Sequence, residues 1–228
     1  MKKMSETVVF FGSGPVAAAS LRLLSRNFTI EAVVTKPRPA HHKGPVPVLD
    51  VATKLNFPVL TATDKHGLND LFASRPVKSR LGVLIDFGVI VPQQIIDYFS
   101  LGIVNSHFSL LPEWRGADPI TFSILSGQKV TGVSLMLLVA GMDEGPLLAQ
   151  SAYELPATIT GPVLADHLIE ISNAMLIEVL PKYVTGDIAA HPQNPAVEPT
   201  YSRKLSKEDG RIDWGKPAEQ IEREIRAF

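Results

Sequence analysis

The sequence predicts an α/β protein in which a mostly parallel sheet is flanked by helices. Two observations favour this fold class. Short apolar, β-branched runs alternate with segments of helical spacing, and the first four runs are almost continuously apolar. Such runs are typical of strands that helices cover on both faces. Strand and helix in alternation indicate parallel strands joined by helical crossovers.

The expected strands are residues 7–11, 30–34, 82–87, 103–104 and 133–139. The expected helices are residues 15–26, 46–55, 65–73, 92–98, 117–126, 161–183 and 217–228. Several of these helices begin at Pro, whose fixed φ suits the first helical turn. After Gly186 the sequence becomes rich in Pro and then polar and charged. We therefore expect a main domain over residues 1–188, a Pro-rich linker over 189–200 and the start of a C-terminal region over 201–228.

The composition limits the classes of function. The 228 residues include no Cys, which excludes disulfides, thiolate metal sites and a Cys nucleophile and favours a cytoplasmic setting. We expect no targeting segment at the N-terminus, and no apolar run approaches the ~20 residues of a membrane span. The net charge of −1 argues against binding nucleic acid through the overall field of the protein.

One local stretch is basic. No acidic residue lies between Glu31 and Asp50, whereas Lys36, Arg38 and Lys43 are basic. This pattern is compatible with a solvated, Pro-rich loop and also with a local contact to nucleic acid.

A glycine turn, Gly12-Ser13-Gly14-Pro15, follows the first expected strand. Such a turn can present backbone N–H groups to a phosphate at a helix N-terminus. The third glycine of a dinucleotide fingerprint is missing, since Ala18 lies where the helix is already expected. A plain strand-to-helix turn and a ligand contact both remain open.

Asn105 and His107 follow the apolar run that ends at Val104. Side chains two residues apart on an extended segment point to the same side, so we expect both to face one pocket. Ligands of open α/β sheets bind at the carboxyl ends of the strands. There an Asn can donate to a developing oxyanion, and a His can transfer a proton near neutral pH. Capping of the following loop is the alternative.

Asp143 lies in a glycine-flanked turn directly after the strand expected at 133–139. It is either an ordinary turn residue or a third member of the same site, because the turn also follows a strand end. Asn105, His107 and Asp143 form a poor ligand set for zinc. No Ser lies in a Gly-x-Ser-x-Gly elbow, which argues against a Ser–His hydrolase.

Four motifs in this order resemble those of the folate-dependent formyltransferase superfamily. They are Asn105-Ser106-His107, Ser109-Leu110-Leu111-Pro112 with Arg115-Gly116, Thr131-Gly132-Val133-Ser134, and Met142-Asp143-Glu144-Gly145. Within the superfamily the chain is most similar to methionyl-tRNA formyltransferases, through Thr35-Lys36-Pro37, Trp114-Arg115-Gly116-Ala117 and residues 204–214. The resemblance covers essentially the whole chain. It implies a Rossmann-like formyltransferase fold, with the catalytic domain over residues 1–188.

The resemblance also implies a reaction, namely transfer of the formyl group of 10-formyltetrahydrofolate to the α-amine of methionyl-initiator-tRNA, with no metal. Asn105 and His107 would donate to the oxyanion, and His107 would pass a proton to the leaving folate nitrogen. Asp143 would either fix the imidazole or accept the amine proton through a water. The implied folate contacts are Phe87, Val89, Ile90, Val91, Ser109, Leu110, Leu111, Pro112, Leu138, Ala140 and Gly141. The implied tRNA contacts are Lys36, Arg38 and Lys43.

Three other functions stay open. A sugar-nucleotide N-formyltransferase or a formyltetrahydrofolate hydrolase would share the fold, the donor and the three polar residues. A non-catalytic nucleotide-binding module would instead use residues 12–15. Trp114 and residues 204–214 favour the tRNA enzyme. The loop at 38–45, which is shorter than the basic loop of the tRNA enzymes, and the missing C-terminal domain favour the sugar enzyme.

Two departures from the family pattern shape the remaining expectations. Asp118 stands where the family commonly has a small residue, and Phe228 ends the chain where the family continues into a C-terminal β-barrel. We therefore expect a truncated form or a short homologue, monomeric, that binds tRNA weakly.

Overall fold

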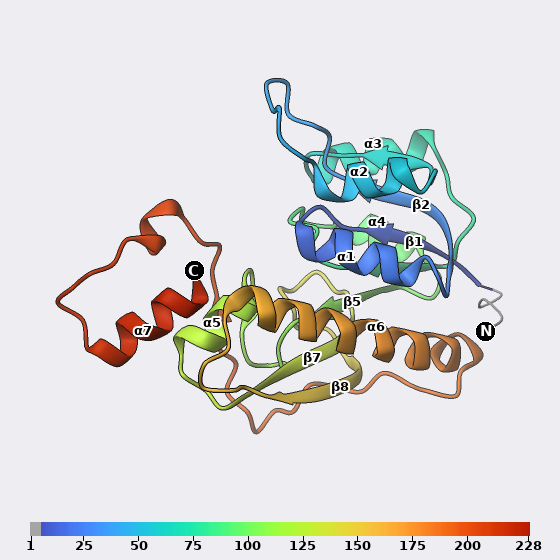
Figure 1. The fold of residues 1–228 in the computed structure, drawn as a ribbon. Helices are drawn as coiled ribbons and strands as arrows, with labels where there is room; N and C mark the ends of the chain where they lie inside the picture. Colours follow the sequence, from blue (N-terminus) through green and yellow to red (C-terminus); the bar gives the residue numbers. More distant parts are fainter. Residues whose placement is uncertain (1–5) are drawn as a thin grey trace.

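A seven-stranded sheet with the order β3-β2-β1-β4-β5-β7-β8 forms the centre of the computed structural model, which describes residues 6–228 (Figure 1). The strands are β1 (Thr7–Phe11), β2 (Thr29–Thr35), β3 (Val59–Thr61), β4 (Leu81–Leu84), β5 (Ile103–His107), β6 (Arg115–Gly116), β7 (Val130–Leu137), β8 (Leu147–Glu154) and β9 (Tyr201–Ser202). The helices are α1 (Pro15–Leu24), α2 (Pro47–Lys54), α3 (Lys65–Ser74), α4 (Gln93–Tyr98), α5 (Pro119–Leu125), α6 (Gly161–Thr185), the 3₁₀ turn η1 (Lys207–Gly210) and α7 (Ala218–Ala227). Most of the N-terminal segment, for which the sequence predicts no targeting signal, lies outside the described residues.

The predicted fold class is confirmed. Strands β3, β2, β1, β4 and β5 pair in parallel, and β7 and β8 extend the sheet antiparallel beyond β5. The strand expected at 82–87 ends earlier, at Leu84. Asp86 adopts a φ of +44°, which turns the chain out of the extended conformation.

Alternate residues of β1 enter two different cores. Val8 and Phe10 belong to the core on the side of α1 and α6, and Val9 and Phe11 belong to the core on the side of α3 and α4. The Phe11 ring lies 6.0 Å from the ring of Phe72. This alternation shows helices on both faces of the sheet, as the apolar runs predict.

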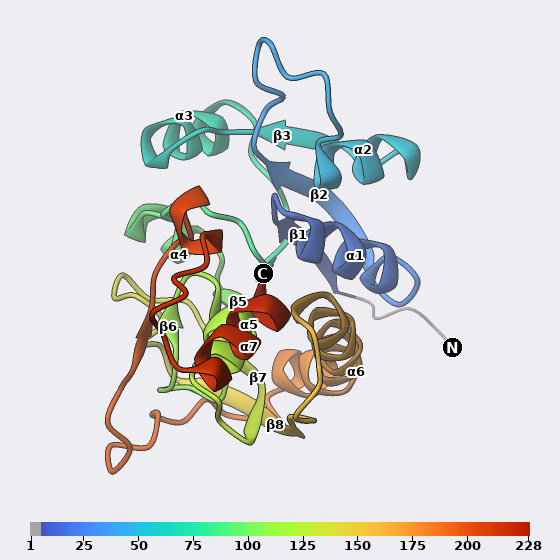
Figure 2. The ribbon, with the colours of Figure 1, turned by 60° about the vertical axis from the view of Figure 1, so that its left-hand side comes forward.

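The Pro-rich segment 189–200 runs back along the main body. Its first part pairs with β8 through a two-way bridge between His191 and Leu147, with N···O distances of 2.7 and 2.9 Å. Its last part leads into β9, which pairs in parallel with β6. Helix α7 then lies beside α5 (Figure 2). No helix between residues 6 and 228 is long and apolar enough to cross a membrane.

Candidate active site

Strand β5 carries Asn105 and His107 on one of its faces. Ser106, between them, points the opposite way, where its hydroxyl lies 2.7 Å from that of Ser172 on α6. Asn105 and His107 therefore face away from α6, and each is only 6% exposed. The strand is longer than predicted, because β7 pairs with it as far as His107, which lies opposite Ser134. The two side chains are therefore held within the sheet, whereas the sequence pattern predicts them just after the end of the strand.

Asp143 faces the same pair from the turn between β7 and β8. Its Oδ1 accepts a hydrogen bond from Asn105 Nδ2 at 3.3 Å, and its Oδ2 lies 3.8 Å from His107 Nδ1. The backbone N–H of Gly116 donates to Oδ2 at 2.7 Å. Asp143 has a φ of +52°, a left-handed conformation that Asp and Asn tolerate better than most residues. The structure therefore brings the three predicted catalytic residues together.

The protonation pattern of His107 follows from its neighbours. Its Nε2 lies 2.8 Å from the carbonyl oxygen of Trp114. A carbonyl can only accept, so Nε2 carries the proton in the neutral imidazole. The other ring nitrogen, Nδ1, is the one beside Asp143 and is the atom at which this site can gain or lose a proton.

Trp114 and Arg115 precede the residue, Gly116, that binds Asp143. Both are half-buried, because Trp114 Nε1 donates to Gln128 at 2.6 Å and the indole lies 5.7 Å from the ring of Phe122. Arg115 donates to Gln193 at 2.8 Å and lies 3.5 Å from Glu144. The two residues before Gly116, whose N–H binds Asp143, are thus held by side-chain contacts.

The loop 109–112 is anchored to β7. The Ser134 hydroxyl donates to the carbonyl of Ser109 at 2.6 Å and accepts from the N–H of Leu111 at 3.0 Å. Ser109 and Leu111 are buried, whereas Leu110 is half-buried, and the Leu111–Pro112 peptide bond is cis. Contacts from Ser109 and Leu111 to a ligand would therefore come from the backbone.

The other predicted folate contacts lie on two adjoining segments. Residues 87–91 follow β4 and residues 138–141 follow β7, and Val89 and Leu138 pack against the same core. Phe87 and Val91 are buried, Ile90 is 78% exposed, and Ala140 is exposed beside the half-buried Gly141. Only some of these side chains can reach a ligand directly.

The glycine turn after β1 does not present open N–H groups. The N–H groups of Ser13 and Gly14 both donate to the carbonyl of Asp86, at 2.9 and 3.3 Å. The carboxylate of Asp86 lies so close to Gly14 that a Cβ there would clash at 1.8 Å. A carboxylate thus occupies the helix N-terminus where a phosphate would bind, which argues against the nucleotide-binding reading of this turn.

Asp86 has an unusual environment. Its pKa is raised to about 6, mainly because the carboxyl group is desolvated and also because the negative charge of Asp118 lies nearby, while the N–H of Ala17 and the charge of Lys36 act in the opposite direction. The residue as a whole is nevertheless exposed to solvent.

The three predicted tRNA-contacting residues differ in their surroundings. Arg38 donates to Asp50 at 2.9 Å and to the carbonyl of Gly44 at 2.7 Å, so it braces the loop between β2 and α2. Lys36 lies at the base of that loop, close enough to Asp86 to affect its pKa. Lys43 is exposed near the loop tip, which projects from the body of the protein (Figure 1).

Three contributors to the site were not predicted from the sequence. They are the N–H of Gly116, the carbonyl of Trp114 and the side chain of Gln193, which donates to the carbonyls of Asp143 and Gly145. Two of these are backbone groups, which no residue type encodes. Gln193 lies in the Pro-rich segment, which has no strand or helix pattern to indicate its direction.

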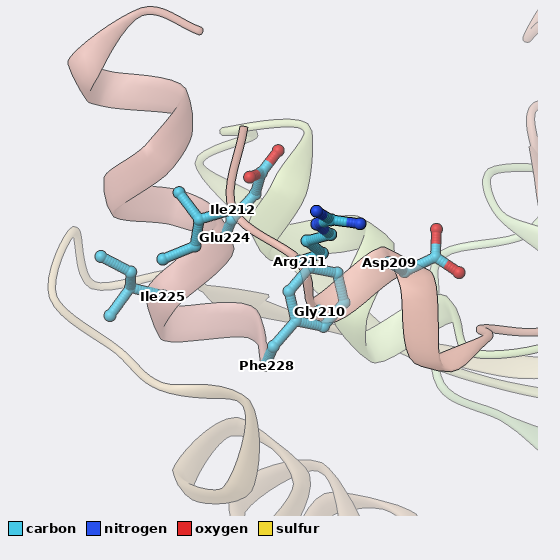
Figure 3. Close-up of a pocket in the computed structure, with 7 residues that line it drawn as sticks. All are labelled: Asp209, Gly210, Arg211, Ile212, Glu224, Ile225 and Phe228. Carbon is cyan, nitrogen blue, oxygen red and sulfur yellow. The ribbon is translucent and has the colours of Figure 1, made fainter. Parts of the chain in front are cut away.

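Elsewhere, a shallow pocket lies between η1 and α7 and shares no residue with this site (Figure 3). It is lined by Asp209, Gly210, Arg211, Ile212, Glu224, Ile225 and Phe228. Within residues 6–228, no group of three or more His, Cys, Asp or Glu side chains is arranged to hold a metal ion.

Known proteins resemble this chain in sequence and in fold. Residues 8–180 match the family model "Formyl transferase", and residues 204–228 match "Formyl transferase, C-terminal domain". The methionyl-tRNA formyltransferase of Chloroflexus aggregans is 41% identical over 97% of this chain and 73% of its own length. That of Paracoccus denitrificans is 36% identical over 97% of this chain and 74% of its own.

Solved structures share the fold at lower identity. An N-formyltransferase from Helicobacter canadensis, in complex with folinic acid and dTDP-3-aminofucose, has a TM-score of 0.75 and 19% identity over 98% of this chain and 80% of its own. Phosphoribosylglycinamide formyltransferase from Bacillus halodurans has a TM-score of 0.65 and 22% identity, over 80% of this chain and 97% of its own.

These matches define the class: the chain belongs to the formyl transferase family. Within that family it groups with the methionyl-tRNA formyltransferases, since its relatives at 36–41% identity over nearly the whole chain carry that name.

Proposed function

We propose that this chain transfers the formyl group of 10-formyltetrahydrofolate to the α-amine of methionyl-initiator-tRNA. The observation that carries the proposal is the convergence of Asn105, His107 and Asp143 from two separate segments into one site. The sequence relationship to methionyl-tRNA formyltransferases supports the choice of acceptor. A cytoplasmic setting fits a chain without Cys.

The chemistry requires one bond to form and one to break. The amine nitrogen of the acceptor attacks the formyl carbon, and the carbonyl oxygen becomes an oxyanion in a tetrahedral intermediate. The bond between that carbon and N10 of the folate then breaks. The amine loses one proton and N10 gains one, so formyl-amine and tetrahydrofolate are the products.

Asn105 and His107 supply the hydrogen-bond donor and the proton that these steps require. The Nδ2 group of Asn105 makes only a long bond to Asp143, at 3.3 Å, so it can turn to an oxyanion at small cost. A single amide donor of this kind is worth about two to three powers of ten in rate. His107 can pass a proton through Nδ1, because Nε2 is engaged by the Trp114 carbonyl.

Asp143 is the negative group beside that nitrogen. Its Oδ2 lies 3.8 Å from Nδ1, which is too long for a direct hydrogen bond and leaves room for adjustment or for a bridging water. A carboxylate here stabilises the imidazolium when His107 holds a second proton. It also offers an acceptor for the proton that leaves the amine.

The pterin ring of the donor would lie between residues 87–91 and 138–141. Backbone groups in these segments can bind its ring nitrogens and carbonyl while half-buried apolar side chains such as Val89 and Leu138 pack on its faces. Leu110 and Pro112 would close the site. Lys36, Arg38 and Lys43 would meet the phosphates of the tRNA.

The acceptor is tested by measuring formyl transfer to methionyl-tRNA, to a dTDP-amino sugar and to water. The proposal predicts that methionyl-tRNA is formylated with the highest kcat/KM. Preference for the amino-sugar nucleotide would assign the chain to the second candidate, whose fold it shares with the Helicobacter canadensis enzyme. Release of formate without any acceptor preference would instead show a hydrolase.

A further inference from the structure

Gln193 makes three hydrogen bonds to two turns of the site with one side chain. Its Nε2 donates to the backbone carbonyl of Asp143 at 2.7 Å and to that of Gly145 at 2.9 Å. Its Oε1 accepts from Arg115 Nη2 at 2.8 Å. The carboxamide therefore connects the turn that carries Asp143 with the turn whose Gly116 binds the Asp143 carboxylate.

The backbone around Gln193 is fixed at both ends. The bridge between His191 and Leu147 holds it on one side, and the hydrogen bond from the N–H of Arg115 to the carbonyl of Thr200, at 2.9 Å, holds the other. Most residues from 191 to 200 are exposed, but Gln193 is half-buried and turned inward. A single inward amide on an otherwise solvated segment indicates a specific role for that side chain.

Hydrogen bonds of this kind stabilise the turn that carries Asp143. Asp143 has a φ of +52°, which Asp tolerates better than most residues but which is still stabilised by contacts that hold the backbone. Its own side chain is held by Gly116 on one side and Asn105 on the other. Without Gln193, the carbonyls of Asp143 and Gly145 would lose the donor that fixes the backbone of the turn.

We infer that Gln193 is a positioning residue, which keeps the Asp143 carboxylate facing His107 and Asn105 during formyl transfer. It does not touch the reacting atoms. The inference rests on the proposed function insofar as it assigns a catalytic role to Asp143.

The test compares three variants of the full chain in steady-state formyl transfer. Gln193→Met keeps the length of the side chain but removes both polar groups, and Gln193→Glu keeps an acceptor for Arg115 but removes the donor. Asn194→Ala is the matched control, because the Asn194 side chain is exposed and bonds only locally to Ala196. We expect both Gln193 variants to lose about tenfold or more in kcat with the KM for the folate donor within about threefold, and the control to match the parent.

A double-mutant cycle shows whether Gln193 acts through Asp143. In an Asp143→Asn background, Gln193→Met should cost less than about threefold, because the group that it positions is already lost. If Gln193→Met lowers kcat as much in the Asp143→Asn background as in the parent, the inference is overturned. A normal kcat in Gln193→Glu would also overturn it, because the loss of activity in Gln193→Met would then come from the missing contact to Arg115.

The crystal structure of Gln193→Met supplies a readout besides activity. We expect the Asp143 carboxylate to leave the N–H of Gly116, and an unchanged 2.7 Å contact would overturn the inference. If the parent chain does not formylate methionyl-tRNA, only the proposed function is contradicted. The crystal structure of Gln193→Met still shows whether Gln193 positions the Asp143 carboxylate.

Discussion

The backbone N–H of Gly116 donates a 2.7 Å hydrogen bond to Oδ2 of Asp143, although 27 residues separate them in the chain. The bond aims the carboxylate across the site, so that its other oxygen meets Asn105 Nδ2. Gly116 itself is held by the pairing of β6 with β9. The position of the Asp143 carboxylate thus depends on a strand that lies after the Pro-rich segment.

Asp143→Asn should reduce kcat by about 10²-fold or more. Asn tolerates the positive φ, so we expect the variant to fold. It offers one acceptor oxygen where Gly116 and Asn105 both donate, and it has no charge to stabilise the imidazolium. Donor affinity, measured by fluorescence titration, should stay within about threefold of the parent. Asp166→Asn, at an exposed position on α6, makes the same change away from the site and is the control. Loss of folate affinity with a normal kcat would make Asp143 a binding residue instead.

Gly116→Ala should impair both stability and turnover. A Cβ at Gly116 would lie 2.3 Å from the carbonyl oxygen of Ser202, and the φ of +103° strains any other residue. We expect a destabilisation on the order of 1–3 kcal/mol, measured by urea unfolding, together with a lower kcat. Gly210→Ala is the control, since nothing lies within 4 Å of its added Cβ. A Gly116→Ala variant as stable and active as this control would refute the role of the turn.

Asp86→Asn should change how stability depends on pH. The folded pKa of Asp86 is raised to about 6 from an ordinary 3.8, so the folded state binds more protons between these values. The contribution of Asp86 to stability is therefore present below about pH 4 and is lost as the pH rises through about 6. Asn cannot ionise, so the variant should gain stability relative to the parent across this range.

The measurement is the free energy of unfolding of both proteins at several pH values, with Asp166→Asn on the exposed side of α6 as control. Because solvent reaches Asp86, we expect a smaller amplitude than the pKa shift alone gives. A difference between Asp86→Asn and the parent that does not change with pH would show that Asp86 titrates normally.

The basic loop should contribute a small salt dependence to tRNA binding. Each phosphate that a Lys neutralises adds about one unit to the slope of log K against log salt. Lys36→Ala and Lys43→Ala should each lower the slope by roughly one, whereas Lys54→Ala at the end of α2 should not. Arg38→Ala should act differently, since its pairing with Asp50 shapes the loop. If the slope is unchanged in both Lys variants, this loop does not contact the tRNA.

The fold was predictable where burial leaves a strong pattern. The run Val8–Phe11 of β1 is apolar throughout, and the run 30–34 of β2 is apolar apart from Glu31, because helices cover both faces. Both strands were therefore predicted. Strand β8 was missed, since one of its faces is accessible and its sequence alternates without a continuous apolar run. Strand β3 was missed because only three residues form it.

The candidate site was predictable only in part. The spacing of Asn105 and His107 indicated a shared face. The position of Asp143 after a strand end left it open as a third member, and the family resemblance favoured that reading. The N–H of Gly116 and the carbonyl of Trp114 are backbone groups, whose direction depends on the left-handed φ of +54° at Trp114 and +103° at Gly116. Nothing in a Pro-rich segment shows that Gln193 returns to the site, because that contact depends on tertiary pairing with Leu147.

The most direct test of the proposed reaction uses three neighbouring positions on β5. Formyl transfer to methionyl-tRNA is measured at saturating donor for Asn105→Ala, His107→Ala and Ser106→Ala. Ser106 is the control, because it faces α6 on the opposite side of the same strand. We expect the first two variants to fold normally and to lose about 10²-fold or more in rate, and Ser106→Ala to retain most of the parental rate. Transfer within about threefold of the parent in folded Asn105→Ala or His107→Ala would contradict the account.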